Sequence, residues 1–244
     1  MKKTRADIRL MELGLVDSRT RAQARILAGQ VFLGSQRIDK AGEQVAIDAV
    51  LRVTELERYC SRGGGKLEGA LVDLALDVGG LVAADVGAST GGFTDCLLQH
   101  GAARVYAVDV GHGQLAEKLR QDPRVVVMDR TNARHLTPSS FPEAIELVVV
   151  DASFISLDKL LPAIAGFVAA GGRLLSLIKP QFEVGREEAT RSRGVITDQA
   201  VRARAVQAAL DAVAAAGFEL LGDCPCRVPG PKGNVEHFVL ARRL

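Results

Sequence analysis

The sequence predicts an α/β fold in which a mostly parallel, doubly wound sheet follows a small α+β module. From about residue 66 onward, short apolar runs alternate with helical patterns, as in strands that are buried on both faces and joined by helical crossovers. The N-terminal quarter lacks this alternation. A chain of 244 residues is long enough for one large domain and one small one.

The N-terminal module begins with two short helices. Apolar residues recur at helical spacing over residues 5–15 and 18–28, with Gly14 at the end of the first segment and Ser18 as the N-cap of the second. Apolar runs separated by turn residues then predict short strands at residues 31–33, 37–38, 45–47 and 51–53.

The body of the protein is predicted to contain a seven-stranded sheet. The apolar runs that indicate its strands are 81–86, 105–108, 125–128, 147–150, 174–178, 218–222 and 236–241. Helical patterns lie at 92–99, 157–169 and 198–216, and the last of them stops at Gly217, a typical C-cap residue.

A glycine run that ends in a lysine, SRGGGKL, precedes the body. A nucleotide phosphate loop would have such glycines, but Leu67 stands where a Ser or Thr would hold magnesium, and no strand leads into the run. We therefore interpret residues 59–65 as a Gly-rich linker between an N-terminal domain of residues 1–58 and a body of residues 66–244. Lys66 then lies in the first turn of the body.

Charge is distributed unevenly along the chain. Residues 1–66 carry 13 Lys or Arg and 8 Asp or Glu, whereas the remainder carries 18 basic and 21 acidic residues, and the net charge is +2. A basic N-terminal segment on a mildly acidic body favours a nucleic-acid anchor attached to an enzyme.

The sequence predicts neither a membrane span nor a metal site. The longest uncharged apolar segment, residues 160–172, is shorter than the roughly 20 residues that a spanning helix needs. The charged start MKKTRADIRL does not resemble a secretory signal, so we expect a cytoplasmic protein. Of the four cysteines, only Cys224 and Cys226 are close together, which favours packing at a strand end over metal binding.

A glycine-rich turn, DVGASTGGFTD, follows the first body strand and opens a helix. Such turns bring the backbone close to a ligand in dinucleotide and S-adenosylmethionine sites alike. Here the spacing is D-x-G-x-x-x-G-G, and Asp109 and Asp129 end the next two strands, where carboxylates can accept hydrogen bonds from ribose hydroxyls and an adenine amino group. This order resembles the class I S-adenosylmethionine methyltransferases. It implies S-adenosylmethionine as the cofactor, bound by Asp85, Gly87, Ala88, Ser89, Thr90, Gly91, Gly92, Phe93, Asp109, Val110, Asp129 and Asp151.

Polar residues at element ends bear on the methyl acceptor. A ribose 2′-hydroxyl is a weak nucleophile that needs a positioned base, and a lysine serves when burial or a second cation lowers its pKa from about 10.4. Lysines and carboxylates at element ends occur in the order of the Lys-Asp-Lys-Glu tetrad of FtsJ-type 2′-O-ribose methyltransferases, which this body resembles: Lys66, Asp151, Lys179 and Glu236. The resemblance implies that these four are catalytic, and it leaves open which lysine is the base.

Other acceptors fit the sequence less well. Base-amino methyltransferases commonly carry Asn/Asp-Pro-Pro-aromatic at the end of the fourth strand, where this chain has Asp-Ala-Ser-Phe at residues 151–154. Cytosine C5 enzymes need a cysteine near that strand or the next, and none lies between Cys96 and Cys224.

The N-terminal module resembles the S4 RNA-binding domain. The matching string is RADIRLMELGLVDSRTRAQARILAGQVFLGSQ at residues 5–36. The resemblance implies recognition of RNA shape and phosphates rather than stacking on bases. The residues expected to contact RNA are Arg5, Arg19, Arg21 and Arg25.

Over nearly its full length the chain resembles the TlyA family, historically called hemolysin A. Its segments SRGGGKL, DVGASTGGFTD, VDVGHGQL, VVVDASFISL, IKPQFEVGRE and GPKGNVEHF carry the resemblance. Members of that family are ribosomal-RNA cytidine 2′-O-methyltransferases, which implies ribosomal RNA or ribosomal subunits as partners and no integral membrane association. Two alternatives stay open: a non-catalytic RNA-binding or ribosome-assembly protein with a vestigial methyltransferase fold, and a membrane-active hemolysin.

Overall fold

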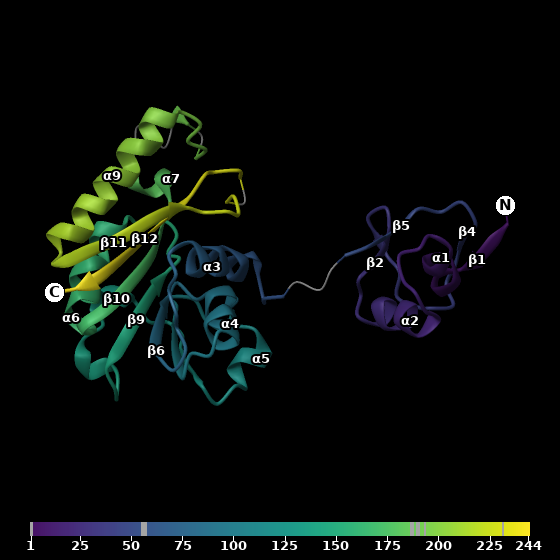
Figure 1. Cartoon of the computed structure of the whole chain (residues 1–244), viewed down its shortest axis with the longest axis horizontal. Coiled ribbons are helices and arrows are strands. Elements are labelled where there is room, and N and C mark those ends of the chain that lie inside the picture. The colour runs from purple at the N-terminus through teal and green to yellow at the C-terminus, as the bar shows by residue number, and fades with distance from the viewer. Residues whose placement is uncertain (1, 55–57, 186–187, 189–190, 193, 231) are drawn as a thin grey trace. The chain divides into compact units, whose positions relative to one another are not determined.

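The chain divides into two compact units, Met1–Glu57 and Arg58–Leu244, each built around its own hydrophobic core. The computed structural model shown in Figure 1 describes residues 2–54, 58–185, 188, 191–192, 194–230 and 232–244. Among these residues, none of the helices combines the length and the apolarity that crossing a bilayer requires.

The N-terminal unit packs two helices against short strands. Its helices are α1 (Ala6–Glu12) and α2 (Arg19–Leu27), and its strands are β1 (Lys3–Arg5), β2 (Val31–Leu33), β3 (Gln36–Arg37), β4 (Gln44–Ala46) and β5 (Leu51–Val53). Strand β1 pairs with β4, and β3, β2 and β5 form a second sheet. Ser18 caps α2 as predicted, since its side chain accepts a hydrogen bond from the Arg21 amide at 3.3 Å. Leu10, Ile26 and Ile38 are fully buried between these elements.

The body contains a seven-stranded sheet in the order β11-β12-β10-β9-β6-β7-β8. The strands are β6 (Val82–Val86), β7 (Arg104–Val108), β8 (Val125–Met128), β9 (Ile145–Val150), β10 (Val168–Ile178), β11 (Phe218–Pro225) and β12 (His237–Arg243). Strand β12 runs antiparallel to both of its neighbours, whereas the pairs from β10 to β8 are parallel. The predicted α/β class and the mostly parallel seven-stranded sheet are confirmed.

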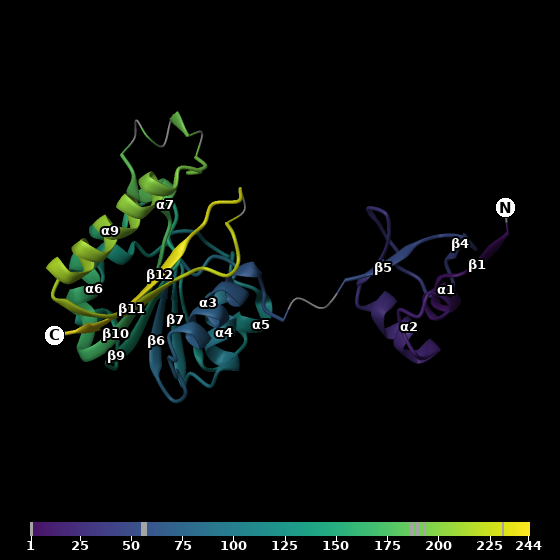
Figure 2. The ribbon, with the colours of Figure 1, turned by 45° about the horizontal axis from the view of Figure 1, so that its top comes forward.

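Helices cover both faces of this sheet (Figures 1 and 2). On one face lie α3 (Arg62–Asp73), α4 (Gly92–Gln99) and α5 (Glu117–Arg120), and on the other lie α6 (Leu161–Phe167) and α9 (Gln199–Ala215). Successive side chains of a strand therefore enter different cores. In β9, Leu147 and Val149 belong to the first core and Val148 and Val150 to the second. This double burial explains why the strands read as unbroken apolar runs.

The glycine run does not form the flexible linker that we predicted at residues 59–65. Helix α3 begins at Arg62, so the three glycines lie inside it and Lys66 lies in its second turn. A Cβ atom on Gly64 would overlap the ring of Tyr59, and a Cβ on Gly92 would overlap the Ser61 side chain and the backbone of Gly64. Close packing at the start of α3, rather than flexibility, therefore requires glycine at positions 64 and 92.

Candidate active site

A cavity of about 680 Å³ opens at the edge of the sheet where the parallel strands end. Its walls come from the start of α3, the turn after β6, the segment after β9, helix α7 (Pro180–Glu183) after β10, and the turn before β12. Because β12 is antiparallel, its amino end meets the carboxyl ends of its neighbours. Strand β6 is flanked by β7 and β9, so the cavity lies at the position where open α/β sheets bind ligands.

One ion pair in the cavity joins the ends of β9 and β10. Lys179 Nζ lies 2.6 Å from Asp151 Oδ1, and it also donates hydrogen bonds to Ser153 Oγ at 2.9 Å and to the Asp151 carbonyl at 3.3 Å. The Lys179 side chain is only 8% exposed. These contacts hold the ammonium group at one position in the cavity.

A second ion pair joins α3 to the turn before β12. Lys66 Nζ lies 2.5 Å from Glu236 Oε2, and the two side chains are 8% and 1% exposed. Gly230 leaves room for this carboxylate, because a Cβ at that position would lie 2.7 Å from Glu236 Oε1. A buried ion pair is expensive to desolvate, so its presence in a cavity is more typical of function than of stabilisation.

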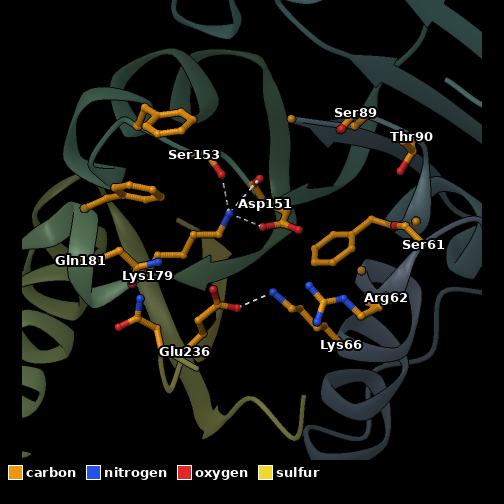
Figure 3. Close-up of a pocket in the computed structure, with 18 of the residues that line it drawn as sticks. Ser61, Arg62, Lys66, Ser89, Thr90, Asp151, Ser153, Lys179, Gln181 and Glu236 are labelled. Carbon is orange, nitrogen blue, oxygen red and sulfur yellow. Dashed lines mark hydrogen bonds and ion pairs between the residues drawn. The ribbon is translucent and has the colours of Figure 1, made fainter. Parts of the chain in front are cut away.

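The structure thus brings all four residues of the predicted tetrad to one cavity. Figure 3 shows the Lys179 pair and the Lys66 pair facing each other across it. Each ammonium is matched by one carboxylate, and both pairs border the same space. Such a site can hold a hydroxyl group, orient it and move its proton.

The glycine-rich turn after β6 forms another wall. Gly87 has φ +88°, and a Cβ there would lie 3.0 Å from the Asp151 carbonyl oxygen. Glycine therefore allows the turn to lie against the end of β9. Six residues of the predicted cofactor set from this turn line the cavity: Gly87, Ala88, Ser89, Thr90, Gly92 and Phe93. Gly91, with φ +95°, faces Leu115 and Leu119 instead.

Asp85 lies in strand β6 and is fully buried. Thr94 Oγ1 donates a hydrogen bond to Asp85 Oδ2 at 2.7 Å, whereas Oδ1 has no hydrogen-bond partner among the described residues. Burial raises the pKa of this carboxyl to about 7. Asp85 therefore supports the turn through α4 and is not itself part of the cavity lining.

Besides Asp85 and Gly91, three further residues of the predicted cofactor set lie outside the cavity lining. Asp109 accepts hydrogen bonds from the backbone amides of Ser89 at 2.9 Å and Gly111 at 2.6 Å. Asp129 accepts from the Gly113 amide and pairs with an arginine of α5. Val110 is 71% exposed. Their contacts with ribose and adenine stay a prediction.

Several cavity residues were missed by the sequence reasoning. Ser61 and Arg62 adjoin the glycine run, and Lys232 and Asn234 lie in the GPKGNVEHF segment. Their closeness in sequence to Lys66 and Glu236 could have indicated that they belong to the same site. Phe154 lies three residues after Asp151, but nothing in the sequence indicated that its ring would be exposed. It is 92% exposed, has φ +65°, and its ring centroid lies 5.3 Å from that of another lining residue in α7.

Asn234 fixes the wall beside Glu236. Its side chain is buried, donates a hydrogen bond to the Gly194 carbonyl at 2.8 Å and accepts one from the Ile196 amide at 2.9 Å. The Asn234 side-chain amide thus pairs with one backbone carbonyl and one backbone N–H of residues 194–196. Gly194 and Asn234 both line the cavity.

The four arginines predicted to contact RNA all lie in the N-terminal unit. The buried carboxylate of Asp7 draws two of them together, since Arg5 and Arg19 both donate to it at 2.9–3.0 Å. These contacts hold the pKa of Asp7 well below its usual range. Arg21 pairs with an aspartate one turn away at 2.6 Å, and Arg25 donates to a glutamine at 3.0 Å.

Known proteins similar to this chain are methyltransferases or carry the hemolysin name. The chain matches the FtsJ-like methyltransferase family over residues 59–243. It is 45% identical to the 16S/23S rRNA (cytidine-2'-O)-methyltransferase TlyA of Mycobacterium tuberculosis over 99% of this chain and 90% of that protein. It is 39% identical to Hemolysin A of Brachyspira hyodysenteriae over 93% of this chain and 96% of that protein.

Solved structures give the same picture of the fold. A protein of Streptococcus thermophilus, named provisionally as a hemolysin, superposes with a TM-score of 0.76 at 39% identity, over 100% of this chain and 89% of its own. An S-adenosylmethionine dependent methyltransferase of Mesorhizobium loti superposes with a TM-score of 0.54 at 17% identity, over 75% of this chain and 100% of its own. At that identity the likeness concerns the fold alone.

Proposed function

The chain belongs to the FtsJ-like methyltransferase family, and from this premise we propose that it methylates the 2′-hydroxyl of a ribose in ribosomal RNA. The observation that carries the proposal is the pair of buried lysine–carboxylate contacts beside a glycine-rich turn. The printed name of the Mycobacterium tuberculosis relative supports ribosomal RNA as the substrate and cytidine as the target nucleoside. With ribosomal RNA as its substrate, the protein would act in the cytoplasm, where ribosomes are located.

We propose S-adenosylmethionine as the methyl donor, because the turn after β6 fits it. Gly87 and Gly92 line the cavity, and their lack of side chains lets the turn lie close to the end of β9 and to the start of α3. Phe93 supplies an apolar wall. When bound there, S-adenosylmethionine supplies a methyl group attached to a positively charged sulfur. Asp85 would steady the turn from the strand below it.

In this proposal the acceptor ribose lies between the two ion pairs. Lys179 orients the 2′-hydroxyl and, as the neutral amine left when Nζ releases a proton to water, takes the hydroxyl proton, while Asp151 and Ser153 hold Nζ in place. Lys66, held by Glu236, positions the ribose from the opposite wall. The carboxylates keep both lysines aimed into the cavity.

The test of this mechanism is single-turnover methylation of purified ribosomal subunits with labelled S-adenosylmethionine. Lys179→Ala and Lys66→Ala should each lower the rate constant by roughly 10²- to 10⁴-fold, the range for a lost acid–base or positioning group. Lys159→Ala is the matched control, because that lysine is exposed and lies outside the cavity lining. Near-normal rates for both cavity variants would sink the mechanism.

A non-catalytic assembly protein is the rival proposal. A vestigial site tends to lose polar residues, whereas this cavity retains four charged residues in two close pairs. Calorimetric titration with S-adenosylmethionine separates the two proposals, since only the enzyme needs the cofactor. Mass-spectrometric mapping of ribose methylation then identifies the nucleotide and the subunit.

We also propose that the N-terminal unit is an S4-like RNA anchor. Its basic helix α2 and its two arginines gathered by Asp7 support that role. The four arginines are well suited to phosphates, because guanidinium groups form paired hydrogen bonds with anionic oxygens.

A further inference from the structure

The cavity carries more positive charge than its ion pairs need. Its lining holds four cations, namely Arg62, Lys66, Lys179 and Lys232, and two carboxylates, Asp151 and Glu236. The carboxylates pair with Lys66 and Lys179. Neither Arg62 nor Lys232 has an ion pair with any other described residue. The proposed cofactor does not balance this excess, because S-adenosylmethionine itself carries a net positive charge.

Arg62 stands at an unfavourable position for a cation. It is the first residue of α3, where the helix dipole disfavours positive charge, and the first turn contains no acidic residue. The N-cap Ser61 makes no side-chain hydrogen bond to the helix amides. Arg62 lies one turn before Lys66 on the same side of α3, and Figure 3 shows both on the wall that faces Lys179. A local conflict of this kind is typical of a functional position.

Lys232 belongs to a different wall of the same cavity. It lies in the turn before β12, which is closed by hydrogen bonds from the Gly230 amide to the Asn234 carbonyl at 2.9 Å and from the Gly233 amide to the Gly230 carbonyl at 2.8 Å. The Asn234 side chain anchors this turn to the segment at Gly194 and Ile196. The turn is therefore a built support for a cation at the cavity.

We infer that Arg62, together with the uncapped start of α3, and Lys232 bind backbone phosphates on either side of the target ribose. This inference rests on the proposed function and adds a substrate subsite to it. An RNA strand that places a ribose between two lysines must bring its flanking phosphates to the walls beside it. Arg62 and Lys232 are the two cavity cations that no carboxylate of the described chain neutralises.

The test measures binding of ribosomal subunits by filter retention at several salt concentrations, with methylation assayed in parallel. Loss of one phosphate contact reduces the slope of log affinity against log salt by about 0.7 to 0.9, or roughly sixfold in affinity near 0.1 M salt. Arg62→Ala and Lys232→Ala should each show this loss, and the double variant should show about twice the change in slope. The dissociation constant for S-adenosylmethionine should stay at the wild-type value.

Two further variants sharpen the result. Arg204→Ala removes an exposed arginine of α9 outside the cavity lining and should bind subunits as the wild type does. Arg62→Glu places an acid at the start of α3, so its melting temperature should not fall below that of the wild type although its affinity for subunits falls most. If Arg62 had only a structural role, its replacement would lower the melting temperature and the affinity for subunits together.

A wild-type salt slope in either alanine variant overturns the inference, and so does a loss confined to S-adenosylmethionine binding. Failure of the proposed function gives a different result. In that case the wild-type protein leaves the subunits unmethylated, while the salt slopes still decide whether Arg62 and Lys232 contact phosphate.

Discussion

The residues of the tetrad are paired across long stretches of chain. Lys66 and Glu236 are 170 positions apart and meet at 2.5 Å, whereas Lys179 pairs with Asp151. The order of the four residues in the sequence does not reveal which lysine meets which carboxylate. Only the antiparallel direction of β12, which brings Glu236 to the cavity edge, decides it.

The buried carboxyl of Asp85 leads to a pH-dependent prediction. Its pKa is raised to about 7 by burial, compared with about 3.9 in an unfolded chain. Between these values the folded protein binds a proton that the unfolded chain does not, so stability falls as pH rises. The stabilising contribution is complete below about pH 4 and is lost as the pH passes 7. The Asp85→Asn variant should lack this dependence.

Urea unfolding at pH 4.5, 6.0 and 7.5 checks the prediction. Both tyrosines, Tyr59 and Tyr106, lie in the body, so tyrosine fluorescence reports on that unit. The stability of Asp85→Asn relative to the wild type should increase by roughly 3 kcal/mol over this range, at about 1.4 kcal/mol per pH unit. Asp211→Asn, at an exposed position of α9, should shift the profile by a constant amount. Parallel profiles for Asp85→Asn and the wild type would show that Asp85 ionises normally.

At the scale of elements, α3 shows why a glycine run need not be a loop. Gly64 faces the buried Tyr59, whereas a Cβ on Gly65 would have no atom within 4 Å. The Cys60 amide donates to Asp95 Oδ2 at 2.8 Å, which ties the residues before α3 to α4. The helix thus forms despite its glycines, because tertiary packing overrides their low helix propensity.

The neighbouring glycines give opposite predictions. Gly64→Ala should destabilise the body by about 1–3 kcal/mol, because the new methyl group overlaps the Tyr59 ring. Gly65→Ala should stabilise it by about 0.5–1 kcal/mol, because alanine favours the helix and meets no obstacle.

Denaturation followed by tyrosine fluorescence measures both effects in the same protein. A stabilising or neutral Gly64→Ala would mean that the start of α3 is loosely packed. Residues 59–65 would then be better described as a linker than as the start of a helix.

At the scale of the whole molecule, the proposed RNA anchor and the proposed active site belong to two units with separate cores. The N-terminal unit holds the four arginines, and the body holds the complete cavity. We expect Arg21→Gln and Arg25→Gln together to weaken binding of ribosomal RNA and to lower its salt slope by about 1.4 to 1.8. The affinity for S-adenosylmethionine should be unchanged, because all the described residues that line the cavity belong to the body.

Filter binding over a salt series and calorimetric titration of the cofactor check these two statements. Arg19 is left intact, since its removal would take a partner from the buried Asp7 carboxylate and confuse folding with binding. An unchanged salt slope in the double variant would contradict the anchor role.

The sequence by itself determined the class of the body and the position of most elements. The spacing of apolar residues, the cap residues and the glycine-rich turns are local signals. They predicted α4 at residues 92–99 and β8 at residues 125–128 with the observed bounds. The resemblance to the FtsJ-type tetrad singled out four charged residues at the ends of predicted elements, namely Lys66, Asp151, Lys179 and Glu236.

Only the tertiary structure decided how these residues are used. The pairing of the tetrad, the helical state of the glycine run and the exposure of Phe154 depend on contacts between segments that are distant in the chain. The same holds for Arg62 and Lys232, whose lack of a carboxylate partner among the described residues is visible only when the cavity walls are assembled. Local patterns indicate which face of an element will be buried. They do not reveal which residues that face will contact, because ion pairing and steric overlap arise only when the elements pack together.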